Sequence, residues 1–138
     1  MNEGATPRPQ KRGPLLRYWL PVLLWMGLIF ALSSASSLPQ YPDPLIELII
    51  KKGAHATEYA ILAALVRRAL VHTTALSSPS LWAFLCSVLY ASSDEFHQLF
   101  VMSRQGRWLD VVIDAVGAAL AVLIARVYQR RQASGSSG

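Results

Sequence analysis

The sequence predicts an all-α fold: a polytopic membrane four-helix antiparallel bundle with both termini on the cytoplasmic side (N-in/C-in). Hydrophobic residues make up 53% of the 138 residues and charged residues only 15%, whereas a soluble domain carries about 25% charge. The apolar residues gather in four long segments, and the basic residues lie in short clusters between them. This composition excludes disorder. Because the basic residues form no single stripe, it also argues against nucleic-acid binding.

The first apolar segment, Leu15–Leu32, contains no acidic residue and is predicted to be a plain lipid-facing helix. A secretory signal peptide is the alternative for it, since basic residues precede the apolar run. The second segment, about Pro44–Val66, begins with a proline, which suits a helix start. Both segments have the roughly 20 residues that a helix needs to cross a bilayer.

The third segment spans about Leu81–Val101 and becomes polar only in its last part, from Asp94 onward. The fourth spans about Trp108–Ala125 and carries its acidic residues in the first two turns. We therefore expect one membrane domain over residues 14–128. It is flanked by a disordered basic tail at 1–13 and a disordered tail at 129–138, whose final Ser-Gly-Ser-Ser-Gly has the composition of an appended linker. A single cysteine, Cys86, excludes an internal disulfide and a multi-cysteine zinc site.

The orientation follows from the basic residues. If the N-terminus is cytoplasmic, most of the 13 lysines and arginines fall on the cytoplasmic side, as the positive-inside rule requires: Arg8, Lys11, Arg12, Arg17, Arg67, Arg68, Arg126, Arg130 and Arg131. The outer side then holds Lys51, Lys52, Arg104 and Arg107. The predicted location is the bacterial cytoplasmic membrane, which the chain crosses several times.

Three of the four segments are polar in one half. The second is polar in its first half, the third in its last half and the fourth in its first half. Because antiparallel helices alternate direction, these polar halves lie at one depth, toward the outer face. Ionisable groups inside a membrane are costly and face one another or a wet cavity. The sequence therefore predicts one outward-opening polar pocket, with Gly117 allowing close helix approach.

The residues at this depth resemble a known family. The motifs are Lys52-x-x-His55-x-x-Glu58-Tyr59, then Asp94-Glu95-x-His97-Gln98, then Arg104-x-Gly106-Arg107-x-x-Asp110-x-x-x-Asp114-x-x-Gly117. Together they closely resemble the VanZ-like family of small bacterial membrane proteins, over about Leu15–Ala125. The founding member is linked with resistance to the glycopeptide teicoplanin. The resemblance implies a cell-envelope role and, as a family-level hypothesis, enzymatic action on lipid head groups.

The pocket residues can be assigned roles in such chemistry. His55 and Glu95 are the candidate general acid and base, and Asp110 would orient His55 or activate water. Arg104 would bind phosphate through its bidentate guanidinium. The expected partner is a membrane lipid or lipid-linked envelope precursor, and a homo-oligomer is left open. The candidate substrate-binding residues are Lys52, Glu58, Tyr59, Asp94, Gln98, Arg104, Arg107 and Asp114.

Several alternatives stay open at the level of sequence. His55 and Glu58 also fit a simple structural pair, and Asp94 fits a tie to Lys52. No cofactor is predicted. A divalent metal is the alternative, since carboxylates and histidines are abundant, but the nearby cations would oppose it. A proton-coupled transporter and a non-catalytic module that binds a glycopeptide or peptidoglycan precursor are the other functional hypotheses.

Overall fold

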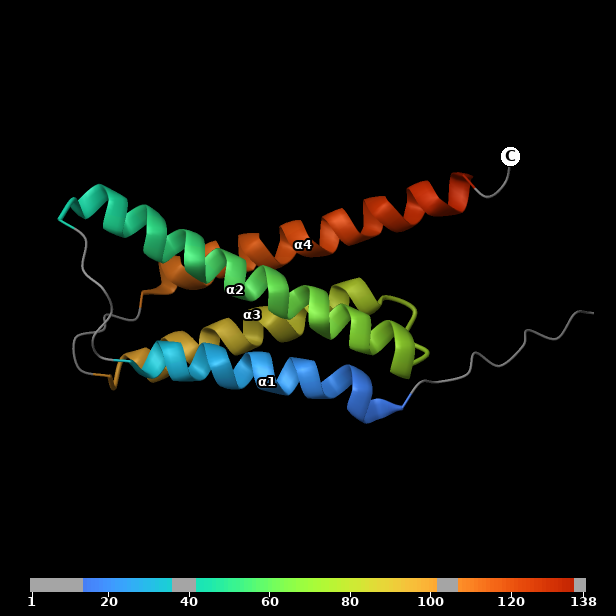
Figure 1. Cartoon of the computed structure of the whole chain (residues 1–138), viewed down its shortest axis with the longest axis horizontal. Helices are drawn as coiled ribbons and strands as arrows, with labels where there is room; N and C mark the ends of the chain where they lie inside the picture. Colours follow the sequence, from blue (N-terminus) through green and yellow to red (C-terminus); the bar gives the residue numbers. More distant parts are fainter. Residues whose placement is uncertain (1–13, 36–41, 102–106, 136–138) are drawn as a thin grey trace, which may run out of the picture.

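The computed structural model describes residues 14–35, 42–101 and 107–135. In these ranges the chain forms four helices and no strands (Figure 1). Consecutive helices run in opposite directions along the bundle (Figure 1), and the predicted all-α class is confirmed. The helices are α1 (Leu15–Ser34), α2 (Pro44–Thr73), α3 (Pro79–Gln98) and α4 (Trp108–Gly135).

The helix starts follow the local sequence. The Asp43 side chain caps α2 by accepting hydrogen bonds from the amides of Leu45 (2.8 Å) and Ile46 (3.4 Å). Pro44 and Pro79 occupy the first positions of α2 and α3, where the missing amide hydrogen costs nothing.

Two helix ends lie farther along the chain than the apolar pattern predicts. α2 continues past Val66 to Thr73, and α4 continues past Ala125 to Gly135. Residues 129–135, which we expected in a disordered tail, are therefore helical. Arginine, glutamine and alanine favour helix, so a helix has no reason to stop where its apolar segment stops.

α2 is the centre of the bundle, because its packing against the other three helices is the most extensive. α1 covers α2 and α3 and makes no packing contact with α4 within the described ranges. The interior contains a few large apolar side chains and many alanines. Small residues let helix backbones approach closely, which is the usual way that membrane helices associate. The alanines in this core are Ala63, Ala69, Ala83, Ala91 and Ala118.

The closest approach lies between α2 and α4 at Gly117. A Cβ atom added to this glycine would lie 2.1 Å from the backbone oxygen of Ala56 and 2.8 Å from its carbonyl carbon. No side chain fits there, so the glycine is required by the helix crossing. The expectation from sequence that Gly117 permits close helix packing is confirmed.

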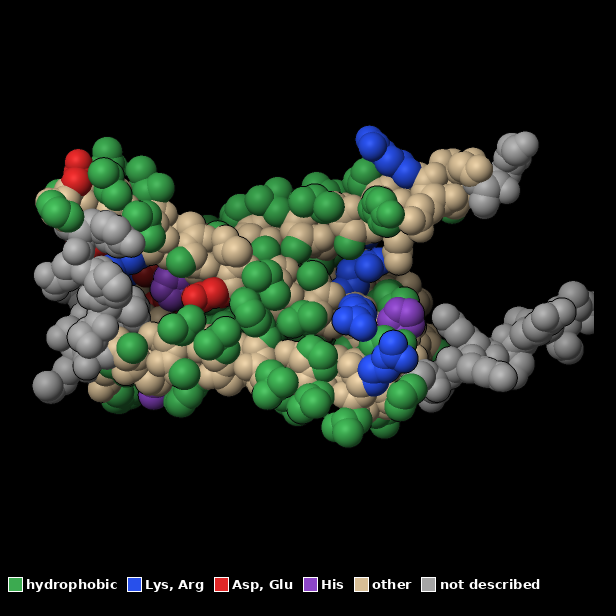
Figure 2. Space-filling model, in the orientation of Figure 1, with side chains coloured by type: hydrophobic (Ala, Val, Ile, Leu, Met, Phe, Trp, Pro, Cys, Tyr) green, Lys and Arg blue, Asp and Glu red, His purple; other side chains and the backbone are tan. Residues whose placement is uncertain are grey.

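The surface is unusually apolar. Large hydrophobic side chains are exposed along all four helices, among them Leu24 (65%), Ile49 (62%), Leu89 (70%) and Ile124 (67%). Figure 2 shows this apolar cover along the length of the bundle. Soluble proteins rarely expose so much contiguous apolar surface, so this exterior is typical of a protein in contact with lipid.

Two of the described helices, α1 and α4, are long and apolar enough by themselves to cross a membrane. We predicted four such helices. α2 and α3 fall short in composition because their polar halves, with charges such as Lys52, Glu58, Asp94 and Glu95, lower their hydropathy.

Candidate functional site

The polar halves of three helices meet at one end of the bundle. This end holds the beginnings of α2 and α4 and the end of α3 (left in Figure 1). Acidic and histidine side chains gather there, whereas basic side chains and a histidine mark the opposite end (Figure 2). We call this group the polar cluster. Its described members are Lys52, His55, Glu58, Tyr59, Asp94, Glu95, Gln98, Asp110 and Asp114.

Contacts between α2 and α4 hold one side of the polar cluster. The two helices start at the same end and run in the same direction (Figure 1), so their contacts follow in chain order. Lys52 forms an ion pair with Asp110. One turn further, His55 Nδ1 lies 4.0 Å from an oxygen of Asp114. The glycine contact of Gly117 with Ala56 comes next.

His55 lies between two carboxylates. Its Nδ1 is 3.9 Å from Glu58 on its own helix and 4.0 Å from Asp114 on α4. Both distances exceed a hydrogen bond but allow strong electrostatic interaction. We expected Asp110 to orient His55 or to activate water. In the structure Asp110 pairs with Lys52 and Asp114 lies beside His55, because α2 and α4 run parallel with α2 starting about six residues before the first residue that faces α4's start.

α3 contributes the other side of the polar cluster. Gln98 donates a hydrogen bond from Nε2 to Asp94 (3.2 Å), one turn earlier on the same helix. Glu95 accepts a hydrogen bond from the backbone amide of Arg107 (2.9 Å), which fixes the end of α3 against the start of α4. The interpretation that Asp94 ties α3 to Lys52 is wrong, since Lys52 pairs with Asp110.

The acidic side chains of the polar cluster are deeply buried. Asp114 is 1% exposed, Asp94 3% and Glu95 5%. Neither carboxylate oxygen of Asp114 has a hydrogen-bond partner among the described residues, and one oxygen each of Asp94 and Glu95 is in the same condition. Asp114 is also an electrostatic neighbour of Glu95, Asp110, Asp94 and Glu58. Buried polar atoms are normally hydrogen-bonded. Packing alone therefore does not explain why so many buried carboxylate oxygens lack a partner here.

The remaining predicted residues are distributed around this centre. Tyr59 is fully buried, with its ring centroid 6.3 Å from that of Tyr90. Arg107 is exposed at the residue that precedes α4. Arg104 lies outside the described residues. Within the described ranges, no group of three or more histidine, cysteine or acidic side chains is arranged to hold a metal ion.

α1 contributes contacts that the sequence interpretation missed. Trp25 donates from its indole nitrogen to the backbone oxygen of Glu58 (2.9 Å), and Tyr90 donates to the backbone oxygen of Met26 (2.8 Å). His97 turns toward α1, where its Nε2 lies 3.2 Å from the hydroxyl of Ser34. The signal was present, since Val22, Trp25 and Ile29 recur at helical spacing and form the inner face of a helix that we expected to face lipid.

The fold and the polar cluster together define a class: a small helical bundle with an apolar exterior and an ionisable site enclosed at one end. Comparison with family models is consistent with this class. The model described as VanZ/LLP1 matches residues 18–129, which is most of the chain. The protein therefore belongs to the VanZ-like family. No curated protein and no solved structure matches it.

Proposed function

We propose that all four helices span the bacterial cytoplasmic membrane, with both termini inside. At 1.5 Å per residue, the 30 residues of α2 and the 20 of α3 extend for about 45 and 30 Å, enough for a hydrocarbon core of about 30 Å. The acidic side chains of both helices are buried or half-buried, and their large exposed side chains are mostly apolar. The end with the basic side chains is also the end where α1 begins and α4 ends (Figures 1 and 2), which fits the positive-inside rule.

Within this topology, we propose that the protein acts on a phosphate-bearing envelope lipid head group that enters the polar cluster from the outer side. The observation that carries this proposal is the position of His55 between Glu58 and Asp114, with the buried Glu95 and Asp110 as electrostatic neighbours of Asp114. An acid–base group with carboxylates on both sides is costly inside an apolar bundle. Its cost is explained if the group handles protons during a reaction.

Each of these residues of the polar cluster has a different chemical role in the proposed reaction. His55 is suited to take a proton from an attacking water or hydroxyl group, because histidine is the side chain most often used as a general base. Asp114, 4.0 Å away, would stabilise the resulting imidazolium. Glu95 is the second acid–base candidate, and Asp110 holds Lys52 in place. In hydrolysis or transfer, the attacking oxygen would form a bond to phosphorus while the bond from phosphorus to the leaving oxygen breaks. The leaving oxygen would receive a proton from the acid.

The phosphate itself would bind where α4 begins. A helix N-terminus attracts anions through its unpaired amides and its dipole. Arg107 adds a guanidinium directly before this terminus, and its amide already contacts Glu95. Arg104 is the further candidate for the phosphate. In this proposal, a change to lipid head groups alters the sensitivity of the cell to teicoplanin.

The test compares variants of matched type in one strain. His55→Gln and Glu95→Gln keep hydrogen bonding but remove proton transfer, which is worth about 10²–10⁴-fold in rate. The control is His97→Gln, because His97 packs against α1 and not in the polar cluster. Cells expressing each variant are grown with ³²P-phosphate, their labelled lipids are separated, and teicoplanin susceptibility is measured in parallel. Arg104→Lys, which loses bidentate binding but keeps the charge, should require more substrate for the same turnover.

The expected result is that His55→Gln and Glu95→Gln lose the labelled product and the change in susceptibility, while His97→Gln keeps both. Each variant must reach the membrane at the wild-type level and keep its thermal unfolding midpoint. Folded variants with full activity would overturn the acid–base proposal. Full susceptibility change without any labelled product would favour the non-catalytic binding module.

A further inference from the structure

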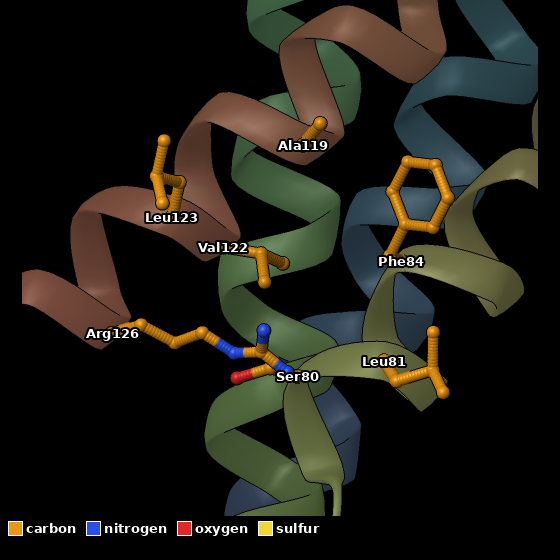
Figure 3. Close-up of a pocket in the computed structure, with 7 residues that line it drawn as sticks. All are labelled: Ser80, Leu81, Phe84, Ala119, Val122, Leu123 and Arg126. Carbon is orange, nitrogen blue, oxygen red and sulfur yellow. The ribbon is translucent and has the colours of Figure 1, made fainter.

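A hollow lies between α3 and α4, toward the end of the bundle opposite the polar cluster. It has a volume of about 330 Å³. It is an open groove, and Figure 3 shows the residues that line it. Phe84 and Ala119 lie at its far end, and Arg126 reaches across its mouth toward Ser80 (Figure 3). The apolar lining comes from both helices: Leu81, Phe84, Ala119, Val122 and Leu123.

The mouth of this groove is cationic. Arg126 is exposed, and its side chain has no hydrogen bond or ion pair with the part of the chain that the structure describes. Arg67 is an electrostatic neighbour of Arg126 and donates from Nε to the hydroxyl of Ser80 (2.8 Å), which is itself 4% exposed. The second hydrogen bond of Arg67 goes to the side-chain oxygen of Gln129. Two guanidinium groups therefore lie close together at the mouth of the groove.

No counter-charge from the described residues balances them. The described acidic side chains lie toward the other end of the bundle, and Figure 2 shows basic side chains without acidic ones here. The groove thus combines an apolar channel with an unbalanced positive mouth. This combination is complementary to a molecule that has a negative head and a long apolar tail.

We propose that this groove binds one anionic phospholipid of the leaflet that borders the connection between α2 and α3. Its phosphodiester is held by Arg126, with Arg67 adding charge, and one acyl chain follows the groove past Val122 toward Ala119 and Phe84. Basic pockets between membrane helices are suited to anionic lipid head groups. From Arg126 to Ala119 the groove follows α4 for about 10 Å at 1.5 Å per residue. It therefore runs along the helices, as a lipid tail does.

This site is distinct from the proposed reaction site. It lies at the other end of the bundle, shares none of the polar-cluster residues, and requires only that the bundle is embedded in a membrane. A second copy of the chain would instead place apolar side chains in the groove and leave the two guanidinium groups without an anion. The charge at the mouth favours the lipid.

The experiment measures lipid selectivity directly. The full chain is reconstituted in phosphatidylcholine vesicles with a trace of spin-labelled phosphatidylglycerol, and electron paramagnetic resonance gives the fraction of motionally restricted lipid. Spin-labelled phosphatidylcholine is the neutral reference. Arg126→Gln removes the charge, with Arg131→Gln as the control on an exposed arginine that does not line the groove. Ala119→Phe fills the groove, with Leu120→Phe as its control on the neighbouring exposed position.

We expect the wild-type chain to prefer phosphatidylglycerol over phosphatidylcholine. Arg126→Gln should lower this preference about fivefold, the factor that corresponds to about 1 kcal/mol for one basic residue at a lipid surface. Ala119→Phe should remove the excess of restricted phosphatidylglycerol over phosphatidylcholine, and both control variants should match the wild type. Inorganic phosphate and chloride at equal ionic strength should have equal effects.

Three results would overturn the proposal. Equal losses in Arg126→Gln and Arg131→Gln would mean diffuse surface charge. Displacement of the lipid by phosphate beyond the effect of chloride would mean a site for the ion alone. A change in oligomeric state of Ala119→Phe, with its lipid preference unchanged, would mean that the groove is an interface between copies. None of these results bears on the polar cluster, so failure here and failure of the proposed reaction are separate.

Discussion

Gly117→Ala is the sharpest perturbation that the structure offers. A Cβ atom at this position would lie 2.1 Å from the oxygen, 2.8 Å from the carbonyl carbon and 3.0 Å from the Cα of Ala56. These atoms belong to the backbone of α2 and cannot move by changing a rotamer. The two helices must therefore separate, which opens the contact that holds the polar cluster together.

The magnitude follows from the size of the clash. Overpacking of a well-packed core costs about 1–3 kcal/mol and occasionally more. Since backbone rather than a flexible side chain is struck, we expect a loss of about 3 kcal/mol in the free energy of unfolding. The same separation should pull Asp114, one turn earlier on α4, away from His55, so activity should fall more than stability alone explains.

The assay is reversible unfolding of the purified chain in detergent micelles, with two glycines as controls. Gly53 lies on α2 itself and Gly27 on α1, and neither has an atom within 4 Å of an added Cβ. Gly53→Ala and Gly27→Ala should be neutral or stabilising by up to about 1 kcal/mol, the helix propensity difference. Ala56→Gly should not rescue Gly117→Ala, because the clash involves backbone atoms. Wild-type stability of Gly117→Ala, or rescue by Ala56→Gly, would refute this description of the α2–α4 crossing.

Two further predictions concern topology and the ion pair. In a Cys86→Ala background, a cysteine at Pro42 should react with a membrane-impermeant thiol reagent added to intact spheroplasts. A cysteine at Ser77 should react only after lysis. The reverse labelling pattern would contradict the N-in/C-in proposal. Lys52→Met should destabilise the chain by about 1–3 kcal/mol in the same unfolding assay, because it leaves the mostly buried Asp110 without its cation. The double variant with Asp110→Asn should lose less stability than the sum of the two single losses. Additive losses would mean that the pair contributes no coupling.

The main features of the fold could be predicted from the sequence because they depend on local pattern. Apolar segment length and the position of prolines placed four helices, and Pro44 and Trp108 begin helices as expected. The helix ends at Thr73 and Gly135 could not be placed in this way. Hydropathy marks where a helix leaves lipid and says nothing about where its hydrogen bonding stops.

The members of the polar cluster were also predictable, but their partners were not. Helical periodicity shows which residues share a face of one helix, and this was enough to bring Lys52, His55, Asp110 and Asp114 together. Which acidic residue meets which basic one depends on the register between α2 and α4. That register is fixed by the contact between Gly117 and Ala56, a tertiary feature that no single-helix pattern contains.

The register set by Gly117 links packing to chemistry. Counting back from the parallel crossing at Ala56 and Gly117, His55 and Asp114 come first, and Lys52 and Asp110 lie about one turn nearer the helix starts. The pair nearer the bundle end is an ion pair, so its charges compensate each other. The pair nearer the crossing leaves Asp114 1% exposed with neither oxygen hydrogen-bonded by a described residue. The most deeply buried carboxylate of the polar cluster therefore lies beside His55, where a proton or a bound group would have a large effect.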